Sequence, residues 1–141
     1  MTEIMSRQDQ EAAPGPEQFF TGRVTLRGQF ARDAPSRVAG AIVTFEPGAR
    51  TAWHSHPLGQ TLVVTAGVGW TQVQDGPVQE FAAGDILLCP ADRPHWHGAT
   101  PESSMTHVAI QEALDGTMVT WMQHVTDEEY LAGRAATRDD R

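Results

Sequence analysis

Three histidines and one glutamine stand at spacings that suit the coordination of a divalent metal ion. His54 and His56 are two residues apart, so both imidazoles project from the same side of an extended strand. Gln60 reaches that side if the strand continues or if residues 57–59 form a bend, and His95 arrives from a separate strand. Imidazole nitrogens and an amide oxygen that converge inside a β-structure are typical ligands of divalent metals. The sequence therefore predicts a metal site.

Three further polar side chains are candidates for the same interior. His97 is two residues from His95, so both rings should point the same way along a strand. His107 and Gln111 share one face of the alternating segment 105–111. Each of the two histidines is expected either to support a ligand through a hydrogen bond or to act as an acid or base beside the metal.

The elements that must position these residues are short strands. From Phe19 onward, strand patterns alternate with turns that contain glycine or proline, which indicates an all-β barrel or sandwich. The expected strands are 23–26, 38–45, 51–56, 61–65, 69–74, 78–81, 85–89, 95–97, 105–111 and 117–122. Thr51 does not share the parity of His54 and His56, so it enters their pocket only if residues 48–52 are irregular.

A short helix is expected near the C-terminus. Thr126 and Glu129 match a capping box with Thr126 as the N-cap. The helix should run from Asp127 to Ala132 and stop at Gly133. Residues 134–141 are expected to be a disordered tail.

Length indicates one domain preceded by an arm. The chain has 141 residues, the usual size of a single domain. Residues 1–17 are polar and contain Pro14 and Pro16, so we expect a flexible arm there. The barrel domain with its helix should then cover residues 18–133.

Composition excludes several classes of partner. The net charge of −8, with only 10 lysines and arginines, disfavours binding to nucleic acid or to anionic membrane surfaces. No apolar run approaches the roughly 18 residues that a membrane span needs, and the N-terminus lacks the apolar region of a secretory signal. The single cysteine, Cys89, cannot form an intramolecular disulfide, which predicts a reducing, cytoplasmic location.

Two segments resemble the sequence motifs of the cupin superfamily. Residues 48–67, GARTAWHSHPLGQTLVVTAG, resemble the first motif, G-x5-H-x-H-x3,4-E-x6-G. Residues 84–95, GDILLCPADRPH, resemble the second, G-x5-P-x-G-x2-H-x3-N. This resemblance implies a single-domain, antiparallel jelly-roll barrel with a metal inside. The four metal ligands of the family fall on His54, His56, Gln60 and His95.

The chain departs from these motifs at three positions. Asp92 and Ala99 replace a glycine and an asparagine that shape a loop and its support. Gln60 replaces the usual glutamate and changes the chemistry, because four neutral ligands leave the full +2 charge on the metal. Such a site should attract anions, act as a strong Lewis acid and stabilise a trivalent metal less well.

A narrower resemblance covers residues 18–131. The runs VTFEPGARTAWHSHPLGQTLVVTAG, PHWHGATP, MTHVAIQEALDG and W-x-x-HVTDEEY are similar to bacterial cupin-type hydroxynitrile lyases. That resemblance implies Mn²⁺ at the four ligand positions, although the ligands also allow Fe²⁺, Zn²⁺, Co²⁺ or Ni²⁺. It implies reversible cleavage of a cyanohydrin, such as (R)-mandelonitrile, to an aldehyde and HCN.

The resemblance also implies that Thr51, His97, His107 and Gln111 line the pocket, and the chemistry of cyanohydrin cleavage suggests their roles. His107 is the preferred base and His97 the alternative, while Gln111 and Thr51 would orient the substrate. The apolar wall of the pocket is expected to include some of Val43, Phe45, Leu62, Trp96 and Leu114.

Two other functions use the same ligands. An iron-dependent cupin dioxygenase or related oxidoreductase is one, and the neutral Gln60 counts against it. A non-catalytic module that binds a metal or a small ligand is the other, and the additional polar groups in the pocket count against it. In each case the expected partner is a small molecule, and the edges of the barrel predict a homodimer or homotetramer.

Overall fold

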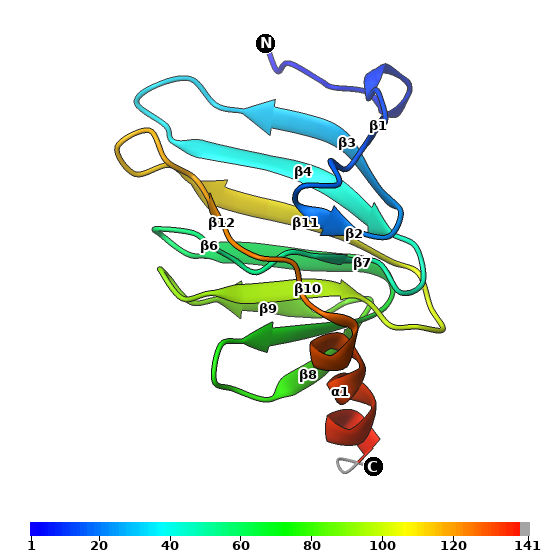
Figure 1. Cartoon of the computed structure of the whole chain (residues 1–141). Coiled ribbons are helices and arrows are strands. Elements are labelled where there is room, and N and C mark those ends of the chain that lie inside the picture. The colour runs from blue at the N-terminus through cyan, green and yellow to red at the C-terminus, as the bar shows by residue number, and fades with distance from the viewer. Residues whose placement is uncertain (139–141) are drawn as a thin grey trace.

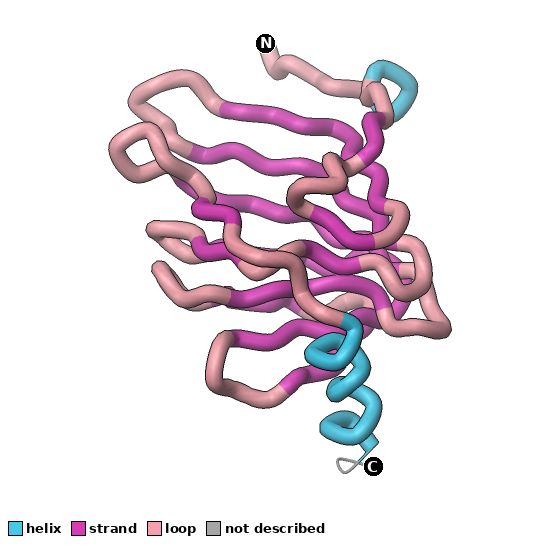
Figure 2. Tube along the Cα trace, in the orientation of Figure 1, coloured by secondary structure: helices cyan, strands magenta, loops and turns pink. Residues whose placement is uncertain are grey.

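Twelve antiparallel strands form one curled sheet in the computed structural model, which describes residues 1–138 (Figures 1 and 2). The all-β, jelly-roll prediction is confirmed. The strands are β1 (Ala13–Pro14), β2 (Phe20–Thr21), β3 (Val24–Ala31), β4 (Val38–Phe45), β5 (Arg50–Thr51), β6 (His54–Ser55), β7 (Gln60–Val73), β8 (Val78–Ala82), β9 (Ile86–Cys89), β10 (His95–Ala99), β11 (Met105–Glu112) and β12 (Thr120–Trp121). A 3₁₀ turn, η1 (Arg7–Asp9), and one helix, α1 (Asp127–Arg138), complete the described elements. The main strand order is β1-β3-β4-β11-β7-β10-β5-β2.

Strand β7 joins the two halves of the molecule. Its first part pairs with β11 and β9, and its second part pairs with β10 and β8. The sequence predicted two strands, 61–65 and 69–74, but the structure has one strand, β7, over both. This strand changes direction at Gly67, whose φ is +77°. A Cβ at Gly67 would lie 1.8 Å from the carbonyl oxygen of Ser104, so only glycine fits this crossing point.

The two faces of the sheet have separate cores. The inner core packs Val24, Phe45, Val64, Phe81 and Met105 inside the curl. The outer core lies between the sheet and α1 and contains Trp53, Trp70, Trp96, Val125 and Tyr130. Figure 1 shows α1 against the lower strands, at the opposite end of the sheet from the N-terminus.

The prediction that α1 stops at Gly133 was wrong. The helix continues to Arg138, so residues 134–138 are helical rather than part of a disordered tail. Gly133 serves close packing instead, because a Cβ at this position would lie 2.7 Å from the ring of Trp70. The rest of the predicted tail, residues 139–141, lies outside the described residues.

Two short strands, β1 and β12, add segments from near each end of the chain to the sheet. The expected arm contributes β1, which pairs with β3 and sets Ala13 opposite Leu26. The expected final strand is shorter than predicted and consists of Thr120 and Trp121, which pair with β6. No helix among residues 1–138 is both long and apolar enough to cross a membrane.

Candidate metal centre

Pairing between β6 and β10 brings the histidines of the two motifs together. His54 and His95 are directly opposite in the strand register, and their ring centroids are 4.3 Å apart. His56 follows β6 and lies 5.0 Å from the ring of His54 and 5.5 Å from that of His95. All three rings are buried, because they face the inside of the curled sheet.

A backbone carbonyl orients each of these rings. Nδ1 of His54 donates to the Ala52 carbonyl at 2.9 Å, and Nδ1 of His56 donates to the Met118 carbonyl at 2.8 Å. Nδ1 of His95 faces the Arg93 carbonyl at 3.4 Å. With the proton on Nδ1, each Nε2 presents a lone pair, which is the arrangement of most metal-ligating histidines. In agreement with this, Nε2 of His56 is buried and has no hydrogen-bond partner within residues 1–138.

Gln60 completes the predicted set of donors. Its Nε2 donates to Oε1 of Gln111 at 3.1 Å, which turns its Oε1 toward Nε2 of His95 at 3.3 Å. The amide oxygen accepts a hydrogen bond from this nitrogen when His95 is protonated on Nε2, and the two atoms could share a cation when the proton is on Nδ1. His54 and His95 therefore offer donor atoms close enough to share a metal ion, and His56 and Gln60 lie beside them.

His97 lies closer to this centre than the sequence indicated. The ligand nitrogens of His54, His95 and His97 all lie within 4.8 Å of one another. Nε2 of His97 is buried and has no partner among the described residues. His97 could thus add a donor to the metal or present a lone pair to a substrate beside it.

His97 and His107 form a hydrogen-bonded pair. Nε2 of His107 lies 3.1 Å from Nδ1 of His97, so one proton is shared between the two nitrogens. The two tautomers leave an open lone pair either on His97 Nε2 or on His107 Nδ1. Both atoms are buried and have no hydrogen-bond partner in the part of the chain that the structure describes. The pair can therefore accept a proton at one end and rearrange its own proton between the rings.

Burial keeps these rings neutral. Loss of solvent lowers the pKa of His54 and of His97 well below 6.5, and neighbouring histidines lower it further. Burial lowers the pKa of His95 and of His107 to about 4. Neutral imidazoles are the form that binds a metal or accepts a proton, so the site is in its active form at pH 7.

Acid is expected to destabilise the metal-free protein between pH 6.5 and about 4. In this window the unfolded chain protonates His95 and His107 while the folded chain does not, so stability falls as the pH is lowered. Each ring changes the free energy of unfolding by up to about 1.4 kcal/mol per pH unit. Urea unfolding of EDTA-treated protein at about pH 7 and about pH 5 measures this effect. An unchanged midpoint would contradict it.

Thr51 does enter the pocket, because the chain is irregular between β5 and β6. It is buried, and its Oγ1 accepts a hydrogen bond from the backbone N–H of His97 at 3.3 Å. Its hydroxyl hydrogen therefore remains available to a substrate.

Of the predicted metal donors and polar groups, all except His95 line one cavity of about 630 Å³. Val43 and Phe45 belong to its apolar wall, as expected, whereas Leu62, Trp96 and Leu114 do not line it. Trp96 alternates with His95 and His97, so it faces outward and packs against Tyr130 of α1. The sequence did not indicate the other wall, made of Phe19, Phe20, Phe30, Met118 and Trp121. Phe19, Phe20 and Phe30 lie outside the expected strands, and Met118 and Trp121 lie in the expected strand 117–122, to which the sequence assigned no inward face.

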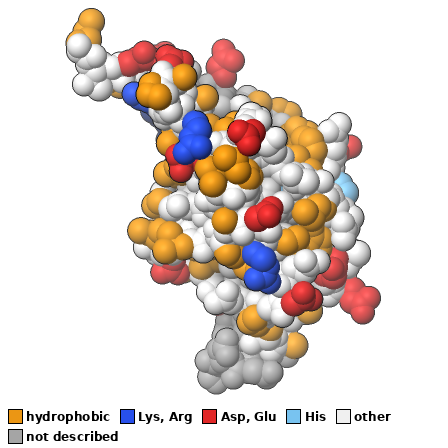
Figure 3. Space-filling view, turned by 90° about the vertical axis from the view of Figure 1, so that its left-hand side faces the viewer, with side chains coloured by type: hydrophobic (Ala, Val, Ile, Leu, Met, Phe, Trp, Pro, Cys, Tyr) orange, Lys and Arg blue, Asp and Glu red, His pale blue; other side chains and the backbone are white. Residues whose placement is uncertain are grey.

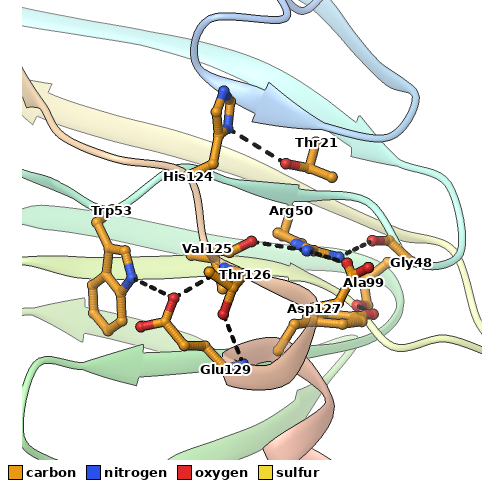
Figure 4. Close-up of polar contacts among 11 residues, drawn as sticks. Thr21, Gly48, Arg50, Trp53, Ala99, His124, Val125, Thr126, Asp127 and Glu129 are labelled. Carbon is orange, nitrogen blue, oxygen red and sulfur yellow. Dashed lines mark hydrogen bonds and ion pairs between the residues drawn. The ribbon is translucent and has the colours of Figure 1, made fainter.

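A network of polar contacts on the outer face of the sheet connects β5 and β10 with the start of α1 (Figure 4). The guanidinium of Arg50, only 5% exposed, donates to the Val125 carbonyl and to Asp127, both at 2.8 Å. It also lies 4.5 Å from the centre of the Tyr130 ring, whose hydroxyl donates to the Ala99 carbonyl on β10. The start of α1 is thus tied to both β5 and β10.

The predicted capping box is confirmed and joins the same network. Oγ1 of Thr126 accepts from the N–H of Glu129 at 3.1 Å, and the Glu129 carboxylate accepts from the N–H of Thr126 at 2.9 Å. The same carboxylate lies 3.5 Å from Nε1 of Trp53, the residue before His54.

Replacing Arg50 with alanine is expected to destabilise the protein by about 3 kcal/mol, because buried bonds to a charged donor and a cation–π contact are lost. Differential scanning calorimetry should show a decrease in Tm of about 10 °C. Arg37→Ala is the matched control, since its 3.8 Å ion pair with Glu112 is half exposed. That variant should change stability by less than about 1 kcal/mol. Equal effects of the two substitutions would rule out the bracing role.

A curled jelly-roll sheet that encloses a group of histidines able to hold a metal ion defines a barrel of the cupin type. The chain belongs to the cupin family, and residues 41–110 match the family described as Cupin domain. It is 56% identical over 128 residues to a protein named (R)-mandelonitrile lyase from Granulicella tundricola. That match covers 91% of this chain and 98% of the relative.

Solved structures are similar as well. A cupin-like protein from Thermotoga maritima superimposes with a TM-score of 0.79 at 38% identity, covering 88% of this chain and 92% of that one. A cupin-2 domain protein from Rhodospirillum rubrum has a TM-score of 0.67 at 14% identity, covering 95% and 86%. The second likeness supports the fold alone.

Proposed function

We propose that this chain is a metal-dependent hydroxynitrile lyase that reversibly cleaves cyanohydrins, such as (R)-mandelonitrile, to an aldehyde and HCN. One observation carries the proposal: the hydrogen-bonded pair of His97 and His107 lines one cavity with His54, and His97 belongs with His54 and His95 to a group that could hold a metal ion. The 56% identity to a protein named (R)-mandelonitrile lyase supports the same reaction.

We assign the metal to His54, His56, Gln60 and His95, and Mn²⁺ is the metal we propose. When bound, such a metal would supply positive charge for the oxygen or the cyanide of the substrate. The four neutral donors would leave that charge undiminished. The carbonyls that hold the Nδ1 protons of three of these donors would keep the rings in place without a metal.

The histidine pair would carry the proton. His107, with His97 as its hydrogen-bonded partner, takes the proton of the cyanohydrin hydroxyl. The O–H electron pair becomes the second bond of the aldehyde carbonyl, and the bond between the carbinol and nitrile carbons breaks. Its electron pair leaves on cyanide, which receives the proton from the pair and departs as HCN. The reverse sequence adds HCN to an aldehyde.

Two neutral side chains would orient the substrate. Gln111 uses its Oε1 to accept from Gln60, which leaves its amide hydrogens for the hydroxyl or the nitrile. Thr51 accepts from the backbone of His97 and can donate its own hydrogen into the cavity. Both contacts would hold the hydroxyl toward the histidine pair.

The test is release of cyanide and benzaldehyde from mandelonitrile by purified protein loaded with Mn²⁺. Chiral chromatography of the remaining substrate would show which enantiomer is consumed. Oxygen consumption by iron-loaded protein, measured in parallel, examines the dioxygenase alternative. A rate of cyanide release no greater than that of buffer containing Mn²⁺ would reject the proposal.

We also propose that the protein assembles as a homodimer or homotetramer. Ile86 and Leu88 project from β9 with 62% and 79% exposure, and Leu58 is 40% exposed. Hydrophobic side chains also reach the molecular face drawn in Figure 3. Light scattering coupled to size-exclusion chromatography should give at least twice the mass of one chain, and a monomer mass would contradict this. We also propose a reducing, cytoplasmic location, which agrees with the single cysteine, Cys89, being free.

A further inference from the structure

The cavity is much larger than a single-ring cyanohydrin requires. Its volume is about 630 Å³. An apolar cavity of about 150 Å³ already accommodates a benzene ring, so one ring would fill only a fraction of this space. Cavities of this size usually bury a ligand several times larger than a small aldehyde.

Alanine methyl groups form one side of the space that a single-ring substrate would leave empty. The strand register sets Ala109 on β11 opposite Ala41 on β4, and sets Ala39 on β4 opposite Ala31 on β3. All four alanines line the cavity, and we call them the alanine floor. Gln111 lies opposite Ala39, so this floor begins directly beside the polar end of the cavity. Four small side chains on neighbouring strands leave a shallow, flat depression.

The opposite side of this space is aromatic. It is formed by Phe19, Phe20 and Trp121, which we call the aromatic wall. The rings of Phe19 and Trp121 stack with centroids 4.5 Å apart, and Phe20 meets Trp121 edge-on at 5.9 Å. Trp121 also lies 4.7 Å from the ring of His54. The aromatic wall therefore starts at the metal donors, and the space between it and the alanine floor is continuous with the reaction centre.

We propose that the substrate is the cyanohydrin of an extended apolar aldehyde, with a second ring or an equally long chain beyond the first ring. The outer part of the substrate would lie between the alanine floor and the aromatic wall, where it displaces water from apolar surface. The proposal rests on the cyanohydrin chemistry proposed above and adds the class of side chain to it.

Kinetics with Mn²⁺-loaded protein provide the first test. Cyanide release from the cyanohydrin of 4-phenylbenzaldehyde should show a KM about 10- to 100-fold below that of mandelonitrile, the range expected for burying one more ring. Because the second ring is remote from the bond that breaks, kcat should differ by less than about threefold. Equal KM values for the two substrates would overturn the inference of an extended substrate. Release of cyanide from either substrate would still support the proposed reaction.

A blocking variant tests the location. Ala31→Trp adds a bulky ring at the exposed, distal end of the alanine floor, and it should reduce the KM advantage of the two-ring substrate to about threefold or less. Ala82→Trp places the same ring on an exposed position of β8 outside the cavity and should keep the full advantage. Equal ratios in the two variants would contradict the assigned location.

A binding measurement separates this inference from the proposed reaction. Isothermal titration of Mn²⁺-loaded protein with benzyl alcohol and with 4-phenylbenzyl alcohol requires no catalysis. The larger alcohol should bind at least tenfold more tightly, and Ala31→Trp should abolish this difference. That result would support the extended subsite even if no cyanide were released. The proposed reaction alone would then be wrong. Equal affinities would overturn the subsite.

Discussion

Replacing His107 with alanine is expected to lower kcat for cyanide release by about 10²- to 10⁴-fold, the usual contribution of a general base. The ring is fully buried and bonded to His97 at 3.1 Å, so its loss removes both a proton acceptor and the group that sets the tautomer of His97. Metal content should not change, because His107 is not among the predicted donors. Steady-state kinetics and elemental analysis of the same preparation give both values.

His124→Ala is the matched control for that variant. His124 is exposed. Among the described residues, the only hydrogen-bond partner found for its ring is Thr21, at 3.4 Å (Figure 4). This variant should have the parent's kcat and metal content. A His107→Ala protein that retained kcat within tenfold, while His97→Ala lost activity, would assign the base to His97 instead.

Replacing His54 with alanine is expected to lower metal affinity by at least about 100-fold and to reduce cyanide release to the background rate. His54 is the most central donor, with ring contacts to His56 and His95 and a carbonyl bond that orients it. Ser55→Ala removes a side chain of similar burial from the same strand and should keep both properties. EDTA treatment of the parent protein should reproduce the loss, and added Mn²⁺ should reverse it in the parent only. Full activity after metal removal would contradict any role of a metal.

Gln60→Glu gives an informative contrast. A carboxylate should bind the metal about tenfold more tightly and also reduce its effective positive charge, so cyanide release should become slower. Opposite changes in metal affinity and kcat would support the importance of the neutral amide. A faster enzyme would show that the full +2 charge is not what the reaction needs.

Much of the fold follows from local pattern. Alternation with a period of two places His107, Ala109 and Gln111 on one face of β11, and all three line the cavity. The turn residues separate the strands correctly in most of the chain. The expectation failed at Gly67, where two predicted strands are one, because a single glycine can be either a turn or a crossing point inside a strand.

The wall of the cavity shows the limit of such reasoning. Trp96 was one of five candidates for the apolar wall of the pocket, but it belongs to the core under α1. Alternation along β10 places Trp96 on the face of the strand opposite to His95 and His97. It does not show that both faces of the strand are buried. Only the packing of α1 covers the outer face, and that contact joins residues far apart in the chain.

By itself, the sequence determined the spacing of the donors, the alternation that groups them by face and the neutral amide at position 60. These are local properties, because they depend on covalent distance and on strand geometry. The tertiary structure alone decided that His54 stands opposite His95, that His97 is bonded to His107, and that an alanine floor faces an aromatic wall. Those relations depend on which distant strands pair and in which register, and the packing of the whole sheet selects that register.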